Sequence, residues 1–176
     1  DYAAELGADA IGFTLYGGSN HEVEMAEEFR DAQEAARHRD MGVVMWSYPR
    51  GQGVKNDTKS STISYAARLG LELGADVAKI KYPGDPEAMA HACEAAASTD
   101  VVMSGGSKAS DEAFLTTVKE AMDAGAKGLA VGRNVFQREN PEALLDGLEK
   151  VIFQDASVEE GLAAVESHGA QATLDG

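Results

Sequence analysis

The chain has 176 residues, of which 44% are apolar, so it is long enough to bury a hydrophobic core in one domain. Acidic residues number 30 and basic residues 15, and the formal net charge of −15 argues against nucleic acid or an anionic membrane as the main partner. The acidic residues are spread along predicted helices of an alanine-rich chain, a composition typical of proteins from halophilic organisms.

No run of about eighteen apolar residues indicates a membrane span, and residues 1–9 have neither the basic nor the apolar segment of a signal peptide. The single cysteine, Cys93, excludes an intramolecular disulfide and favours a reducing, cytoplasmic setting. Residues 1–9 lack an initiator Met and resemble the last turns of a helix, so we expect further protein upstream of them.

Short apolar runs alternate with helical patterns along the chain. The runs are continuous in hydrophobicity, which is typical of strands buried on both faces of a parallel sheet. In chain order, strands are predicted at 10–16, 43–48, 77–82, 100–104 and 128–132, and helices at 22–38, 61–73, 86–98, 111–124 and 141–153. Asp85 and Asn140 stand before prolines as helix N-caps do, and Gly74 and Gly125 stand where helices should end. The remainder, 154–176, is expected to hold a short helix over 158–165 and a frayed end from 168.

Two architectures fit five consecutive strand–helix units: an open doubly wound sheet and a closed (β/α)8 TIM barrel. No Gly-x-Gly-x-x-Gly follows the first strand, which weakens the dinucleotide-binding form of the open sheet. Glycines, lysines, aromatic residues and arginines instead collect where each strand ends. Because a barrel gathers its strand ends around one mouth, we predict an α/β barrel domain over 1–153, followed by a C-terminal helix or tail over 154–176.

The strongest chemical feature is a pair of lysines inside the strand predicted at 77–82. Lys79 and Lys81 are two residues apart, so both side chains point to the same side of the sheet. If that side is the barrel interior, two amines share one pocket, and desolvation and like charge lower the pKa of a carbonyl-attacking lysine. The alternative is a structural role, in which one lysine extends to solvent and the other pairs with a carboxylate of a neighbouring strand.

Aromatic and basic residues follow the strand predicted at 43–48. Trp46 and Tyr48 share one face, and a phenol near an amine can act as general acid or base. The alternative is an aromatic pair that closes a layer of the barrel. Arg50, in a Pro-Arg-Gly-x-Gly loop, can bind a phosphate with two nitrogens or can hold the loop in place.

Glycine-rich segments follow the last two predicted strands. Ser104-Gly105-Gly106-Ser107-Lys108 lets backbone N–H groups approach an anion, and Gly132-Arg133-Asn134 adds a positive charge one unit later. The loops after the last two strands of a TIM barrel are its usual phosphate site. Gly18 and Ser19, after the first strand, shape the rim and are candidates for a second phosphate contact. The histidines are scattered without zinc-ligand spacing, so no metal is predicted.

Together these segments resemble the archaeal-type class I fructose-bisphosphate aldolases, the DhnA family. The resemblance extends to about Phe153, and its phrases have a specific order and spacing: Leu15-Tyr16-Gly17-Gly18-Ser19, Trp46-Ser47-Tyr48-Pro49-Arg50-Gly51, Ala78-Lys79-Ile80-Lys81-Tyr82, Ser104-Gly105-Gly106-Ser107-Lys108 and Gly132-Arg133-Asn134-Val135-Phe136-Gln137. It implies that the chain holds the C-terminal five βα units, strands 4–8, of the barrel. The family's first three units have no counterpart here, and neither does the acidic residue near their first strand end.

The resemblance implies roles for particular residues. Lys79 matches the family's Schiff-base lysine, Tyr48 its proton-transferring tyrosine and Trp46 a tryptophan of the substrate pocket. The positions that match its phosphate-binding residues are Ser104, Gly105, Gly106, Gly132 and Arg133.

The reaction so implied is reversible cleavage of fructose 1,6-bisphosphate to glycerone phosphate and glyceraldehyde 3-phosphate, a lyase step of glycolysis and gluconeogenesis that needs no cofactor. One alternative is a 2-amino-3,7-dideoxy-D-threo-hept-6-ulosonate synthase of the same family, against which Trp46 and Lys81 favour the aldolase. Another is a non-catalytic sugar-phosphate-binding fragment. We expect a homo-oligomer at full length. Five strands alone leave two open sheet edges, so the isolated chain is expected to fold poorly or to self-associate.

Overall fold

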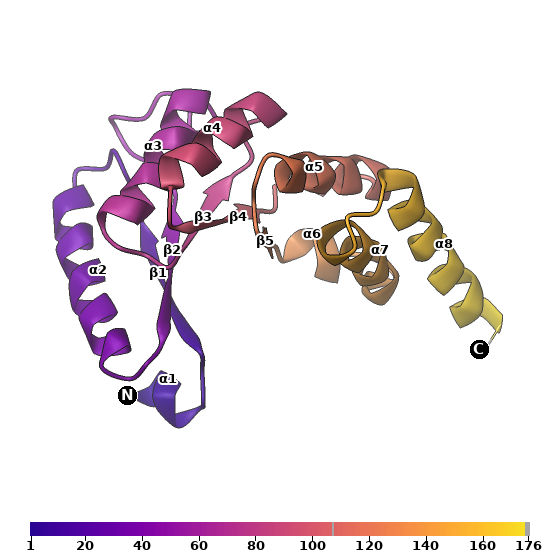
Figure 1. Cartoon of the computed structure of the whole chain (residues 1–176), viewed down its shortest axis with the longest axis horizontal. Helices are drawn as coiled ribbons and strands as arrows, with labels where there is room; N and C mark the ends of the chain where they lie inside the picture. The colour runs from indigo at the N-terminus through magenta and orange to yellow at the C-terminus, as the bar shows by residue number, and fades with distance from the viewer. Residues whose placement is uncertain (107, 175–176) are drawn as a thin grey trace.

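The computed structural model of the chain describes residues 1–106 and 108–174, and strands alternate with helices up to residue 136, after which two further helices follow (Figure 1). The strands are β1 (Ala10–Leu15), β2 (Gly42–Ser47), β3 (Val77–Lys81), β4 (Asp100–Ser104) and β5 (Gly128–Ala130). The helices are α1 (Tyr2–Glu5), α2 (Glu22–Arg37), α3 (Ser60–Glu72), α4 (Pro86–Ala96), α5 (Asp111–Asp123), α6 (Arg133–Phe136), α7 (Pro141–Phe153) and α8 (Val158–Leu174). The five predicted strand–helix units are therefore confirmed.

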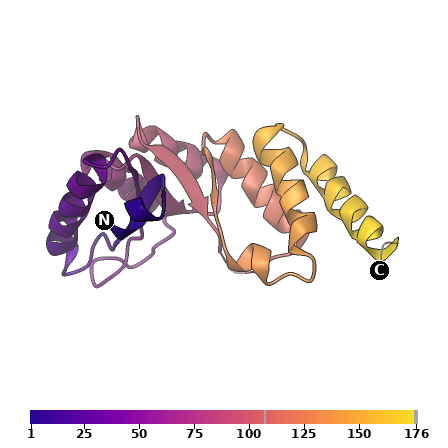
Figure 2. The ribbon, with the colours of Figure 1, turned by 90° about the horizontal axis from the view of Figure 1, so that it is seen from below.

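All five strands pair in parallel, in the order β1-β2-β3-β4-β5. Each crossover thus leads to the adjacent strand and the order never reverses, whereas a doubly wound sheet has a reversal at its switch point. The sheet is singly wound, as in a (β/α)8 barrel, and it supplies five strands of that architecture. Figure 2 shows the sheet between the N-terminal helices and the α7–α8 pair, with the two chain ends far apart.

The two faces of the sheet carry different side chains. One register row runs Phe13–Met45–Ala78–Val101, and its last three members are buried beneath the helices. The next row runs Thr14–Trp46–Lys79–Val102–Gly128, and its members are half-buried or exposed. We call the first side the helix face and the second the open face. Because successive side chains of a strand alternate between faces, every strand contributes to both.

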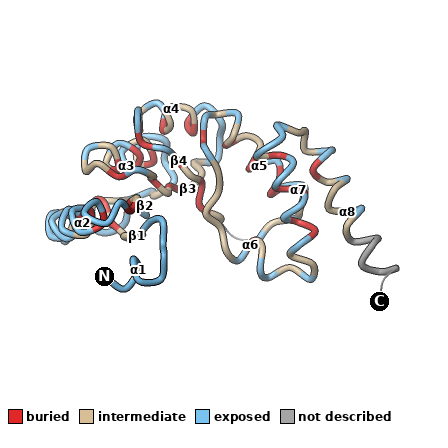
Figure 3. Tube along the Cα trace, turned by 60° about the horizontal axis from the view of Figure 1, so that its bottom comes forward, coloured by how far each residue is buried: buried red, intermediate tan, exposed pale blue. Residues whose placement is uncertain are grey.

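Small residues bring the helices close to the sheet. Ala66 and Ala67 of α3, Ala92 and Ala96 of α4, and Ala121 of α5 are fully buried in the main core (Figure 3). At Gly70 of α3, an added Cβ would lie 2.9 Å from the Cβ of Ala78 in β3, so only glycine permits this approach. The alanine-rich composition therefore gives the core a dense packing that bulkier side chains would force apart.

Helix ends follow the signals in the sequence. The side chains of Asp85 and Asn140 accept hydrogen bonds from Ala88 N and Ala143 N, each at 3.1 Å, which confirms both predicted N-caps. Gly74 has φ of +74° just after α3, a left-handed conformation that ends the helix and turns the chain into β3. Gly125, just after α5, also has a positive φ, of +105°.

The C-terminal region departs from the prediction. The last helix does not stop at 165 with a frayed end after 168: α8 continues to Leu174, and residues 175–176 lie outside the described part of the chain. The prediction gave too much weight to small polar residues, although none after 158 is proline and alanine favours helix. α8 packs on α7, where a Cβ on Gly147 would come within 2.8 Å of Gly161 O. No helix in the described residues is both long and apolar enough to cross a membrane.

Candidate active site

The candidate site lies on the open face, at the C-terminal ends of β2 to β5. In β3, Ala78 and Ile80 are fully buried on the helix face, while Lys79 and Lys81 are half-buried on the open face. Trp46 is the register partner of Lys79 in β2, and Val102 is its partner in β4. The alternation that buries two apolar residues therefore directs both lysines to the open side of the sheet.

Lys79 lies against two aromatic rings. Its Nζ is 5.6 Å from the centroid of the Trp46 ring and 5.9 Å from that of Tyr48, within cation–π range of both. Space for the indole comes from Gly12 in β1, because a Cβ there would lie 2.8 Å from Trp46 Cζ2. The tryptophan, 37% exposed, forms one wall beside the amine. Among the described residues no carboxylate forms an ion pair with Lys79.

A cleft of about 220 Å³ brings most of the predicted residues together. It is lined by Tyr48, Lys79, Ser104, Gly105, Gly106, Gly132 and Arg133, with Ala130, Val131, Asn134 and Phe136 completing the wall. These residues come from four different strand ends, so only the parallel sheet makes them neighbours. An amine, a phenol, glycine backbone and a guanidinium thus surround one space, which suits a carbonyl compound that carries an anionic group. Ser107, in the same predicted motif, lies outside the described residues.

The two glycine loops lie close together, and their backbone faces the cleft. A Cβ on Gly105 would lie 2.9 Å from Val131 Cγ1, so this loop touches the chain leaving β5. At Gly106, an added Cβ would meet nothing within 4 Å, which leaves the backbone open to a ligand. Arg133 is exposed beside them.

Asn134 connects the two loops, a role that its motif did not indicate. Its side chain is buried; Nδ2 donates to Gly106 O at 3.2 Å, and Oδ1 accepts from Ala109 N at 3.3 Å. Arg138 supports the same loop, since Nη2 donates to Ala109 O at 3.0 Å and Nε donates to Asn134 O at 2.7 Å. The Gly-Arg-Asn motif was the available signal for this residue, but a contact across 28 positions is visible only in the folded chain.

Lys81 has a partner that sequence analysis missed. Its Nζ donates to Oδ2 of Asp57, from the loop between β2 and α3, and this ammonium holds the pKa of the Asp57 carboxyl below its usual range despite the opposing effect of burial. The pairing matches the structural alternative for Lys81, except that the carboxylate comes from a loop and not from a strand. Lys81 lines a neighbouring cavity of about 350 Å³, not the Lys79 cleft. The two amines therefore do not share one pocket.

Arg50, Gly18 and Ser19 form the rim near β1 and β2 and are not part of the Lys79 cleft. The guanidinium carbon of Arg50 lies 5.3 Å from the centroid of the Tyr16 ring, and Arg50 N donates to Gly17 O at 2.9 Å. Gly18 N donates to Glu22 Oε2 at 2.6 Å, so this amide already has a partner. The two loops bind each other, which leaves the Arg50 side chain as the cationic group of this rim.

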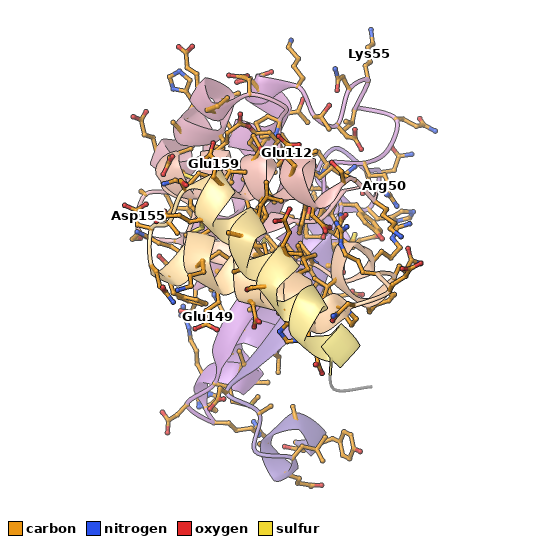
Figure 4. The ribbon with its side chains drawn as sticks, turned by 90° about the vertical axis from the view of Figure 1, so that its right-hand side faces the viewer. Arg50, Lys55, Glu112, Glu149, Asp155 and Glu159 are labelled. Carbon is orange, nitrogen blue, oxygen red and sulfur yellow. The ribbon has the colours of Figure 1, made fainter. Side chains whose placement is uncertain are left out.

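The loop between β2 and α3 carries three basic residues, Arg50, Lys55 and Lys59, and one acidic residue, Asp57. Figure 4 shows Lys55 pointing outward from the loop that also carries Arg50, while Glu112, Glu149, Asp155 and Glu159 lie around helices α5, α7 and α8. Within the described residues no group of three or more histidine, cysteine, aspartate or glutamate side chains is arranged to hold a metal ion.

Known proteins similar to this chain are aldolases. Residues 1–138 match the DeoC/LacD family of aldolases. A class 1 fructose-bisphosphate aldolase of Halobacterium salinarum is 70% identical over 165 residues, which cover 94% of this chain and 63% of that protein. A 2-amino-3,7-dideoxy-D-threo-hept-6-ulosonate synthase of the same species is 36% identical over 161 residues, 92% of this chain and 60% of that protein.

A solved structure of a Schiff-base-forming fructose-1,6-bisphosphate aldolase superposes with a TM-score of 0.83 at 43% identity, covering 86% of this chain and 61% of that one. The chain thus spans somewhat less than two thirds of the length of these relatives. The family match covers more than half of the chain. The chain belongs to the DeoC/LacD family of aldolases.

Proposed function

We propose that the chain is the lysine-bearing part of a class I aldolase that cleaves fructose 1,6-bisphosphate to glycerone phosphate and glyceraldehyde 3-phosphate and catalyses the reverse condensation. The observation that carries the proposal is the cleft in which Lys79 and Tyr48 meet the two glycine loops and Arg133. The 70% identity with a class 1 fructose-bisphosphate aldolase supports this substrate, as does the similarity to a Schiff-base-forming enzyme.

Lys79 would act as the nucleophile. Its neutral amine attacks the ketone carbon, and loss of water from the adduct leaves an iminium, which withdraws electrons from the adjacent carbon. Tyr48, whose ring lies beside the amine, would take the proton of the substrate hydroxyl as the carbon–carbon bond breaks. The bonding pair moves into the iminium, the aldehyde leaves, and protonation and hydrolysis of the enamine release glycerone phosphate and restore the lysine.

The glycine loops would bind the phosphate nearest the ketone. Ser104, Gly105, Gly106 and Gly132 offer a hydroxyl and backbone N–H groups, and Arg133 offers a charge-assisted hydrogen bond. Trp46 would form the wall beside the reacting carbons. Arg50, together with Gly18 and Ser19, would meet a second phosphate at the rim. Local positive charge at these positions would attract a bisphosphate to a chain whose net charge is −15.

The same proposal includes a cytoplasmic setting, a homo-oligomer and a division of the chain into a barrel part, 1–153, and a C-terminal part, 154–176. The hept-6-ulosonate synthase activity uses the same lysine chemistry and is the second candidate. The lower identity of that relative, 36% against 70%, favours the fructose bisphosphate reaction.

Reductive trapping tests the proposal. The chain is incubated with glycerone phosphate and borohydride and is then digested. The mass of the peptide containing Lys79 is measured by mass spectrometry. A mass increase on Lys79 is expected, and it should vanish in Lys79→Arg. Absence of any adduct would reject both lysine aldolase activities and leave a sugar-phosphate-binding role. If an adduct forms, cleavage assays with fructose 1,6-bisphosphate separate the two aldolases.

A further inference from the structure

Two lysines project from the same face of β3, and only one of them is bound by a carboxylate. We propose that Asp57 is a positioning residue that determines which amine becomes the nucleophile, by holding Lys81 as an ammonium outside the Lys79 cleft. The inference rests on the proposed Schiff-base function. It assigns a role to the loop between β2 and α3, and to a residue that does not line the cleft.

Lys79 and Lys81 line neighbouring cavities. They are two residues apart on one face, and their cavities share part of their walls: Ser104, Gly105, Gly106 and Asn134 line both. Lys81 is the register partner of Ser104, which lies in that shared wall. A lysine has four methylene groups, so an unrestrained Lys81 amine can reach the space where the carbonyl must bind. Strand geometry alone therefore does not select Lys79.

The contact with Asp57 provides the selection. Lys81 Nζ donates to Asp57 Oδ2, and both side chains are partly shielded, at 31% and 42% exposed. This ion pair holds the Lys81 amine against the β2–α3 loop, and an ammonium has no lone pair for attack on a carbonyl. Lys79 instead faces the rings of Trp46 and Tyr48.

The position of Asp57 is set by its loop. Thr58 N donates to Asn56 Oδ1 at 3.0 Å, a turn that fixes the backbone on either side of Asp57. The loop is further held by Gly53 N, which donates to Gly18 O at 3.2 Å. Asp57 is thus presented to the end of β3 by a loop anchored on both sides.

The test is the distribution of the borohydride-trapped adduct between the two lysines, measured by peptide mapping after incubation with glycerone phosphate. In the unaltered chain the adduct is expected on Lys79. In Asp57→Asn the share of adduct on Lys81 should rise severalfold, because the Lys81 amine is no longer held by the carboxylate outside the Lys79 cleft. The double variant Asp57→Asn with Lys81→Met should return the adduct to Lys79. Asp155→Asn, which makes the same change at the remote Lys119 ion pair, is the matched control and should leave the distribution unchanged.

A second readout does not depend on the reaction. The Asp57 carboxyl is titrated by NMR in the unaltered chain and in Lys81→Met, where its pKa should rise because the ammonium that lowers it is gone. An adduct that stays on Lys79 at unchanged yield in Asp57→Asn would overturn the inference and leave the proposed function intact. An Asp57 pKa that does not move in Lys81→Met would overturn it as well, even if the Asn variant were to unfold. Absence of adduct in the unaltered chain would overturn the proposed function, and this inference with it.

Discussion

Two rows of side chains cross the sheet one residue apart, and they serve different purposes. The row through Met45, Ala78 and Val101 is buried beneath the helices, whereas the row through Trp46, Lys79 and Val102 lies on the open face. The same strands supply both rows, and successive side chains along each strand point to opposite faces. Substitutions on the helix face should therefore change stability, and those on the open face should change catalysis.

The largest effect is expected at Lys79. In Lys79→Met the nucleophile is absent, and cleavage of fructose 1,6-bisphosphate should fall by at least about 10³-fold. The melting temperature should change little, because the lysine is half-buried on the open face and has no ion pair among the described residues. A coupled assay and a circular dichroism melt measure the two quantities. Lys150→Met, on the outer helix α7, is the control and should keep its activity.

Tyr48→Phe should cost about 10²-fold in turnover, since it removes the proton acceptor and retains the ring beside Lys79. Formation of the borohydride-trapped adduct should largely survive, because the amine and its aromatic contact remain. A variant with full turnover would show that the phenol does not transfer the proton. A variant without adduct would show that the phenol acts before bond cleavage.

A pair of adjacent valines in β2 tests directly whether the two faces of the sheet contribute differently to stability. Val43 is fully buried on the helix face, and Val44 is half-buried on the open face. Val43→Ala should reduce the free energy of unfolding by about 2 kcal/mol, from lost burial and the cavity left behind, and Val44→Ala by less than about 1 kcal/mol. Urea denaturation of both variants gives the comparison. Equal losses would contradict the division of the sheet into two faces.

Gly12→Ala, in β1, should disturb the position of Trp46 in the neighbouring strand β2. The new Cβ would lie 2.8 Å from Trp46 Cζ2, so the indole must move and the wall beside Lys79 moves with it. We expect a loss of about tenfold in kcat/KM, because displaced contacts impair substrate orientation. Steady-state kinetics with a matched Gly106→Ala variant, whose Cβ has no neighbour within 4 Å, would separate a steric effect on Trp46 from an effect on the phosphate loop.

The smallest effect concerns acid stability. The Asp57 carboxyl has a pKa lowered below 3.8 by Lys81, so its contribution to stability is present above that value and is lost as the pH falls through the lowered pKa. The difference in melting temperature between the unaltered chain and Asp57→Asn should therefore be small near neutral pH and should shrink further as the pH falls through the lowered pKa of Asp57. A difference that grows on acidification would mean that Asp57 is not ionised in this contact.

The sequence by itself determined the strands, the helix caps and the type of chemistry, because these depend on local signals. Each of these signals can be read within a few residues: the continuous apolar runs, Asp85 and Asn140 before prolines, and two lysines that are two residues apart in one strand. Local pattern was weakest at the C-terminus, where α8 extends beyond its predicted end.

Only the tertiary structure decided which of these groups meet. The Asp57 contact with Lys81 spans 24 positions and the Asn134 contact with Gly106 spans 28, and neither has a sequence spacing that marks it. Sheet register placed Trp46 beside Lys79, and the β2–α3 loop brought Asp57 to Lys81. A strand pattern specifies the face of a side chain, but its neighbours across the sheet and its loop partners arise only when the backbone closes on itself.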